Sequence, residues 1–124
     1  MSEEMKKYLY DIMSRIDGLH SIVITDRDGV PLLKVSDDEV PEVALKPSIL
    51  STVATVTDQG GKLGLGKNKW IMATYNNYQV IHFNKSSLMV SLIAAANANT
   101  GMLLNLETEL ATLIQNLKTA IDVA

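Results

Sequence analysis

The sequence predicts an α+β domain in which helices pack on an antiparallel sheet of about five strands. Apolar residues recur with helical spacing at both ends of the chain and once in the middle, and short β-rich runs lie between these segments. Turns of a few residues join successive runs, so neighbouring strands are expected to be antiparallel. The predicted order of elements is α-β-β-α-β-β-β-α.

The first helix is predicted over residues 3–16. Glu3 and Glu4 lie at its start, where the helix dipole favours anions. Asp17-Gly18 is expected to end it. Its apolar stripe recurs every three or four residues and consists of Met5, Tyr8, Leu9, Ile12, Met13 and Ile16.

The β-rich runs at residues 19–25 and 30–35 predict a hairpin. Asp26-Arg27-Asp28-Gly29 connects them, and its glycine can adopt a positive φ. The same residues resemble the start of an EF-hand calcium loop. That pattern, however, needs an oxygen ligand where Val30 stands and a glycine where Pro31 stands. A hairpin turn is therefore the favoured interpretation.

A second helix is predicted to begin near Pro47, after a loop with an acidic link at residues 37–39. Its apolar residues cover more than one helical face, and several are β-branched and so form helices poorly. We therefore expect packing on two sides to hold this helix. The sequence leaves Gly60, Gly61 and Gly64 open as its end. The apolar residues are Ile49, Leu50, Val53, Ala54 and Val56.

Three more strands are predicted at residues 70–75, 78–84 and 88–94. Asn76-Asn77 joins the first two in a tight hairpin, because asparagine tolerates left-handed geometry. Asn99-Thr100-Gly101 then introduces a single long helix with the most regular 3.6-residue period in the chain. Its stripe consists of Leu103, Leu106, Leu110, Leu113, Ile114, Leu117 and Ile121.

Composition limits the function. The 124 residues are enough for one hydrophobic core, so a single domain spanning residues 1–124 is expected. The net charge of −3 predicts no general affinity for nucleic acid or anionic lipid. The lack of cysteine excludes disulfides, thiolate zinc sites and cysteine nucleophiles. No signal peptide or spanning segment is visible, so we expect no direct membrane insertion, and any membrane residence must come from a partner.

Two candidate sites of chemistry are disfavoured. Gly61 to Lys67 fits the phosphate-loop string G-x-x-x-x-G-K, but Asn68 lacks the hydroxyl that the pattern needs, and the predicted helix precedes rather than follows it. The only histidines, His20 and His82, have no metal-ligand neighbours in the sequence. We therefore predict no enzymatic activity, no cofactor and no metal.

Trp70 opens the strand that follows the glycine-rich segment. A lone tryptophan usually lies in the core, but tryptophan is also enriched at protein–protein interfaces. Together with the excess of apolar residues on the second helix, Trp70 predicts a surface that another chain buries.

Several strings carry a resemblance, which covers the chain from about Leu9 to Ile121. With the order of elements, they are similar to the roadblock/longin-type regulatory domains. More narrowly, the chain resembles the roadblock-type MAP kinase kinase partner proteins, scaffold subunits of the late endosomal/lysosomal Ragulator complex. The strings are Asp26-Arg27-Asp28-Gly29-Val30-Pro31, Leu50-Ser51-Thr52, Thr57-Asp58-Gln59-Gly60, Lys62-Leu63-Gly64-Leu65, Lys67-Asn68-Lys69, Tyr78-Gln79-Val80 and Ala98-Asn99-Thr100-Gly101.

The resemblance implies a non-enzymatic scaffold that pairs through its second helix and third strand. In such pairs the helices pack antiparallel and the edge strands join two sheets into one. The chain departs from the resemblance at Trp70, where related proteins have a small residue, so the partner's fit there is left undefined. The implied interface consists of Ile49, Val53, Val56, Gly60, Leu63, Trp70, Ile71, Met72, Ala73 and Thr74.

The implied partner is a second roadblock-type subunit, which gives a heterodimer. A lipidated Ragulator adaptor subunit would hold this pair on the cytoplasmic face of the late endosome or lysosome. The implied cargo is MAP kinase kinase and MAP kinase, together with the Rag GTPases that recruit the TOR kinase complex in amino-acid sensing. Two alternatives stay open: a homodimeric roadblock-type dynein light chain or small-GTPase regulator, and a nucleotide-binding enzyme built on residues 61–67.

Overall fold

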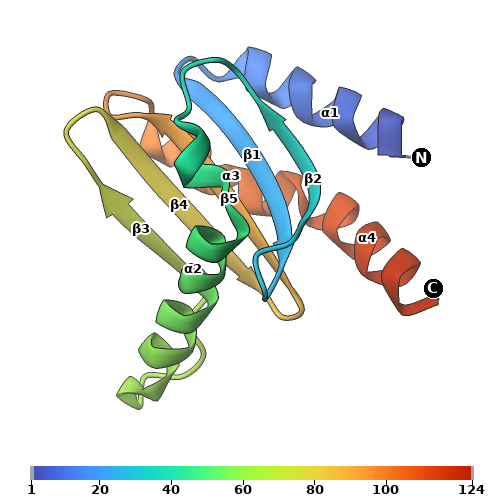
Figure 1. The fold of residues 1–124 in the computed structure, drawn as a ribbon, viewed down its shortest axis with the longest axis vertical. Helices are drawn as coiled ribbons and strands as arrows, with labels where there is room; N and C mark the ends of the chain where they lie inside the picture. The colour runs from blue at the N-terminus through green and yellow to red at the C-terminus, as the bar shows by residue number, and fades with distance from the viewer. Residues whose placement is uncertain (1, 124) are drawn as a thin grey trace.

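A five-stranded antiparallel sheet in the order β2-β1-β5-β4-β3 organises the molecule (Figure 1). The computed structural model describes residues 2–123. Two strands, β2 and β3, form the edges of the sheet. The strands are β1 (Leu19–Asp26), β2 (Pro31–Ser36), β3 (Trp70–Thr74), β4 (Tyr78–Lys85) and β5 (Leu88–Ala95).

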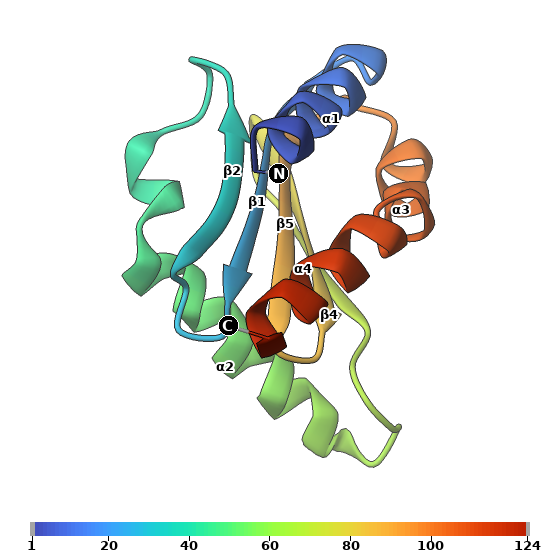
Figure 2. The ribbon, with the colours of Figure 1, turned by 90° about the vertical axis from the view of Figure 1, so that its right-hand side faces the viewer.

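Helices cover both faces of the sheet (Figure 2). On one face lie α1 (Ser2–Arg15), α3 (Thr100–Glu109) and α4 (Ala111–Val123). The other face carries α2 (Pro47–Gly60) and the short 3₁₀ helix η1 (Glu42–Leu45) before it. The predicted α+β class, with its five-stranded antiparallel sheet, is therefore confirmed.

The main core lies between the sheet and the layer of α1, α3 and α4. Alternate residues of the strands point into it, as the two-residue period of a strand requires. The apolar stripe of α1 meets them, with Leu9 and Ile12 completely buried. The strand residues in this core include Ile22, Ile24, Leu33, Val35, Ile81, Phe83, Val90 and Leu92.

The prediction of one long C-terminal helix is wrong, because α3 and α4 are separate. Leu110 caps α3 with φ −84° and ψ −5°, and α4 starts at the next residue. A straight helix over residues 100–123 would be about 36 Å long, whereas the sheet beneath it twists. The break lets Leu103, Leu106 and Leu113 all remain buried against the sheet.

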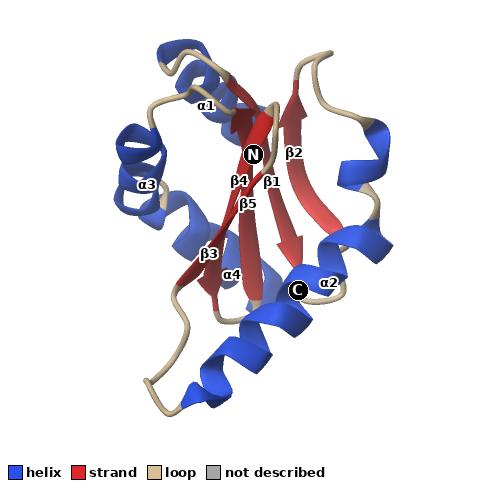
Figure 3. Cartoon of the chain, turned by 90° about the vertical axis from the view of Figure 1, so that its left-hand side faces the viewer, coloured by secondary structure: helices blue, strands red, loops and turns tan. Residues whose placement is uncertain are grey.

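The end of α2 is the first of the three glycines that the sequence left open. The helix ends at Gly60, a 3₁₀ turn η2 (Gly61–Leu63) follows, and Gly64 then adopts a left-handed φ of +77°. The chain beyond α2 projects past the end of the sheet before it returns to β3 (Figure 3).

The β1–β2 turn packs directly on the start of α2. Gly29 has a φ of +83°, and a Cβ there would collide with the Pro47 carbonyl oxygen and the Ser51 nitrogen. Only glycine both adopts this positive φ without strain and lacks the Cβ that would collide. The predicted hairpin is thereby confirmed as a turn that also positions a helix.

Candidate partner-binding surface

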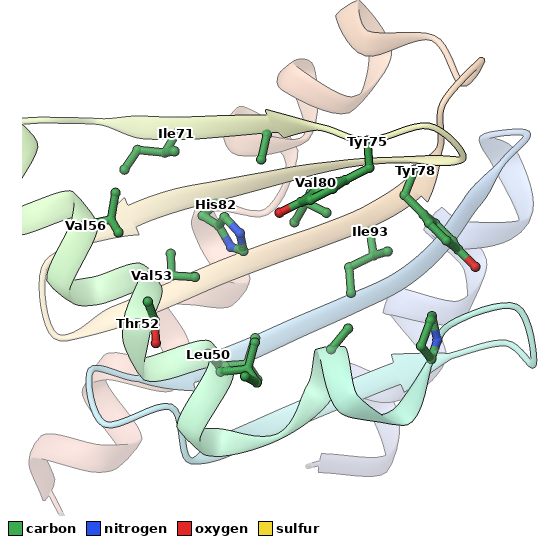
Figure 4. Close-up of a pocket in the computed structure, with 14 residues that line it drawn as sticks. Leu50, Thr52, Val53, Val56, Ile71, Tyr75, Tyr78, Val80, His82 and Ile93 are labelled. Atoms are coloured by element: carbon green, nitrogen blue, oxygen red, sulfur yellow. The ribbon is translucent and has the colours of Figure 1, made fainter.

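An open apolar groove of about 490 Å³ runs between α2, the residues around η1, and the sheet (Figure 4). Figure 4 shows side chains from α2, β3, β4 and β5 turned toward this space. The residues that line the groove include Ile49, Val53, Val56, Ile71, Ala73 and His82.

The second helix uses only one of its two apolar sides within the chain. Leu50 and Ala54 face the sheet and are buried. Ile49 is 48% exposed and Val56 is 47% exposed, while Val53 between them is half-buried. The sequence predicted that both apolar sides of α2 are packed. Within the described residues only the side that faces the sheet is packed. The second side is a wall of the groove.

Strand β3 divides its side chains between two faces. Ile71 pairs with His82 of β4, and both line the groove. Trp70 pairs with Phe83, which belongs to the core on the opposite face. Because side chains alternate along a strand, Trp70 and Met72 lie on the face away from the groove.

The outer edge of β3 has unpaired backbone groups. Within residues 2–123 the strand pairs only with β4, and the Tyr75 N–H donates to the Tyr78 carbonyl oxygen at 2.7 Å. Hydrogen bonding alternates along an antiparallel pair, so odd-numbered residues of β3 bond to β4 and even-numbered ones face outward. The outward N–H groups are those of Trp70, Met72 and Thr74. Such an edge is a template for another strand.

Half of the interface residues that the resemblance implied come together in this groove: Ile49, Val53, Val56, Ile71 and Ala73. The other half, Gly60, Leu63, Trp70, Met72 and Thr74, does not line it. Gly60 ends α2 at a close approach, because a Cβ there would lie 2.5 Å from the Asn68 Nδ2 atom.

Sequence reasoning missed the contribution of β4 and of the β3–β4 turn. Val80 and His82 line the groove opposite Ala73 and Ile71, and Tyr75 and Tyr78 close one end. Alternation along residues 78–84 could have placed Val80 and His82 on one face. It could not show which face α2 would cover.

His82 in the groove wall has a displaced pKa. Burial lowers its pKa from 6.5 to about 4. Its Nδ1 atom lies 2.7 Å from the Ser91 hydroxyl oxygen, so the neutral ring has a hydrogen-bond partner. The imidazole is therefore uncharged at neutral pH, and the groove keeps an apolar character.

A polar network fixes the end of α2 to the sheet. Arg27 donates to the Asp58 carboxylate at 2.7 Å and to the Ser86 carbonyl oxygen at 2.7 Å. It also donates to the Asn84 Oδ1 atom at 3.2 Å, and the Asn84 amide in turn donates to the Asn68 carbonyl oxygen at 2.7 Å. The β1–β2 turn thus connects α2, the β4–β5 turn and the segment that leads into β3.

The string Gly61 to Lys67 lies in a setting unlike that of a phosphate loop. It follows a helix and leads into an edge strand, whereas a phosphate loop follows a buried strand and opens a helix.

The turn that resembles the start of an EF-hand loop uses its first carboxylate within the turn. The Asp26 carboxylate accepts from the Asp28 and Val30 N–H groups and so closes the hairpin turn. Within residues 2–123 no group of three or more His, Cys, Asp or Glu residues is placed to hold a metal ion.

No helix among the described residues has the length and apolar character that crossing a membrane requires.

Solved structures show the class to which this fold belongs. A Roadblock/LC7 domain from Streptomyces avermitilis has a TM-score of 0.67 with this chain, at 15% identity, covering 90% of this chain and 92% of that one. The gliding protein MglB from Thermus thermophilus has a TM-score of 0.65 at 12% identity, covering 83% and 79%. The fold is that of a roadblock domain.

The sequence comparison is more specific. Residues 3–121 match the family described as mitogen-activated protein kinase kinase 1 interacting. The chain is 52% identical to the Ragulator complex protein LAMTOR3 of Pagrus major over 99% of both chains, and 51% identical to that of Homo sapiens over 100% of both. The chain therefore belongs to the mitogen-activated protein kinase kinase 1 interacting family, and the resemblance drawn from its strings is confirmed.

Proposed function

We propose that this chain is a non-enzymatic scaffold subunit that pairs with a second roadblock-type subunit across α2 and β3. The observation that carries the proposal is the apolar groove beside an unpaired strand edge. Isolated domains rarely leave both in the same place, because exposed apolar surface and a free edge each favour association. A sister subunit that lays a helix beside α2 and a strand along β3 would cover them together.

We further propose the assembly in which this pair works. The relatives are named as Ragulator complex proteins, which supports a heterodimer within Ragulator on the late endosome or lysosome. A lipidated adaptor subunit of the complex would supply the membrane attachment, and the Rag GTPases and the TOR kinase complex would be recruited there. The family description supports MAP kinase kinase as a cargo, with MAP kinase beside it.

Tethering two sequential kinases raises their local concentration to about the millimolar range for short linkers, without any new catalytic group. A scaffold of this kind needs binding surfaces and no catalytic constellation. The groove fits this requirement, because its walls are almost entirely apolar.

Purification of the chain with and without its sister subunit tests the proposal. We expect the chain alone to form no stable homodimer, and we expect it to form a stable one-to-one pair with a second roadblock subunit that then captures MAP kinase kinase 1. A tight homodimer that excludes the second subunit would instead support a homodimeric regulator of the roadblock type. Micromolar nucleotide binding that Lys67→Ala abolishes would contradict the non-enzymatic proposal.

A further inference from the structure

The segment between α2 and β3 presents two leucines that do not line the groove. Leu63 is 73% exposed and Leu65 is 86% exposed. Single exposed leucines are ordinary on protein surfaces. These two lie two residues apart, on a segment that projects past the end of the sheet (Figures 1 and 3).

The same segment carries positive charge that no ion pair among the described residues neutralises. Lys62, Lys67 and Lys69 are exposed, and none of them forms an ion pair within residues 2–123. No Asp or Glu occurs between Asp58 and Glu107, although the whole chain has a net charge of −3. This end of the molecule is therefore basic on an otherwise acidic protein.

The two carboxylates that bound this acid-free stretch, those of Asp58 and Glu107, already form ion pairs. Asp58 accepts from Arg27 at 2.7 Å, and Glu107 accepts from Lys85 at 2.9 Å. Neither leaves an unpaired negative charge beside the exposed lysines. The segment consequently offers positive charge to a partner.

The base of the segment is fixed while its tip is open. The Asn84 amide donates to the Asn68 carbonyl oxygen at 2.7 Å, which fixes the end that leads into β3. Toward the tip, Gly64 and Gly66 adopt φ values of +77° and +95°, and a Cβ added at either would meet nothing within 4 Å. Both leucines on this open tip are exposed rather than packed onto the domain.

We propose that residues 62–69 form the docking element for the protein cargo of this scaffold. Leu63 and Leu65 insert into apolar hollows of the cargo, and the three lysines meet carboxylates that surround those hollows. The proposal rests on the proposed scaffold function and names the surface that this function needs. It leaves the groove and the β3 edge to the sister subunit and moves Leu63 from the subunit interface that the resemblance implied to the cargo surface, because neither leucine lines the groove.

Charge favours an acidic protein surface over a lipid surface as the occupant. Recognition of anionic lipid typically uses a cluster of about four to eight Lys or Arg side chains, each contributing about 1 kcal/mol. This segment offers only Lys62, Lys67 and Lys69, on a chain whose net charge of −3 repels an anionic membrane. A protein partner can place individual carboxylates beside each lysine and exclude water around each leucine.

The test uses the purified pair of this chain with its sister subunit and measures binding of MAP kinase kinase 1. For Leu63→Ser with Leu65→Ser, we expect the affinity for the kinase to fall at least about tenfold, as for apolar residues at the centre of an interface. Lys62→Gln with Lys67→Gln and Lys69→Gln should also weaken binding and reduce its dependence on salt.

Matched controls exist on other surfaces of the chain. Val30→Ser with Leu32→Ser alters two apolar residues with the same spacing, 48% and 37% exposed, just before and within the opposite edge strand β2. Lys7→Gln with Lys34→Gln and Lys46→Gln removes three exposed charges elsewhere. Both controls should keep kinase affinity within about twofold, as expected for residues outside an interface.

Each other outcome overturns a specific part of the proposal. Unchanged kinase binding by the leucine variant would contradict docking through this segment while leaving the scaffold function in place. Loss of the sister subunit by the leucine variant would assign both leucines to the subunit interface. Loss of binding to phosphatidylserine vesicles by the lysine variant, with kinase capture intact, would identify a lipid surface instead. Failure of the unaltered pair to bind the kinase would contradict the scaffold function itself.

Discussion

Arg27 shows how one side chain can position a surface that it does not line. Its guanidinium connects the last turn of α2, through Asp58, with the β4–β5 turn, through Ser86. The planar group suits such a task because it presents several donors in fixed directions. The groove depends on where α2 lies, so the effect of Arg27 on partner binding is indirect.

Replacing Arg27 with Met should destabilise the domain by about 2 kcal/mol, because charge-assisted hydrogen bonds to Asp58 and Ser86 are lost while most of the side-chain volume is kept. Urea unfolding measures this change. Asp58→Asn is the milder control, because the contact with the Ser86 carbonyl oxygen survives. Equal stability of Arg27→Met and the unaltered chain would show that the network is not structural.

His82 makes the stability of the domain depend on pH. Its pKa of about 4 in the folded state is below the ordinary 6.5, so the unfolded chain binds the proton more readily. The folded state is therefore favoured fully above pH 6.5 and loses stability as the pH falls toward 4, by about 3 kcal/mol in total.

Unfolding of His82→Gln at several pH values checks this expectation. The glutamine keeps a group that can bond to the Ser91 hydroxyl but cannot take up a proton. The difference in unfolding free energy between the two proteins should change between pH 6.5 and 4. Parallel curves over that range would mean that His82 does not cause the pH dependence.

At the scale of elements, α2 and β3 together define the proposed subunit surface. One side of α2 is buried and the other is a wall of the groove, whereas β3 offers groove side chains and an unpaired backbone edge. The two features are distinct chemically, since one is apolar contact and the other is hydrogen bonding. Each can be removed separately.

Val53→Asp tests the apolar part. A charge at this half-buried groove position should lower affinity for the sister subunit by at least about thirtyfold, because the partner would bury it unpaired. Folding should suffer less, since water still reaches the groove in the free chain. Thr55→Asp is the control on the exposed side of the same helix. Circular dichroism and pull-down compare the two, and equal loss of folding and binding would make Val53 a core residue.

Met72→Pro tests the backbone part. The Met72 N–H faces the open edge, so proline removes no bond to β4 but blocks pairing with an incoming strand. We expect weaker binding of the sister subunit with little loss of thermal stability. Met72→Ala removes the same side chain and keeps the N–H, so it should bind nearly normally. Identical affinities of the two variants would show that β3 does not pair with the partner.

At the scale of the whole molecule, local patterns predicted most of the fold. The first helix, both hairpins and the strands followed from apolar spacing and turn residues, because these signals act over a few neighbours. The break at Leu110 was missed, since the apolar 3.6-residue period runs through Leu110 without interruption and Leu110 itself keeps right-handed helical dihedrals. The Arg27 network was missed because its partners lie up to 59 residues away. Only the β3–β4 register shows that Val80 and His82 belong to the groove surface.

The central claim is that this domain leaves one sheet edge and one side of α2 open for a sister subunit. Amide hydrogen exchange of the chain, alone and paired with a second roadblock subunit, tests it most directly, because exchange reports hydrogen bonding of individual N–H groups. We expect the N–H groups of Trp70, Met72 and Thr74 to exchange rapidly in the free chain and to become protected in the pair. Exchange at these three amides that is unchanged by the partner would contradict the claim.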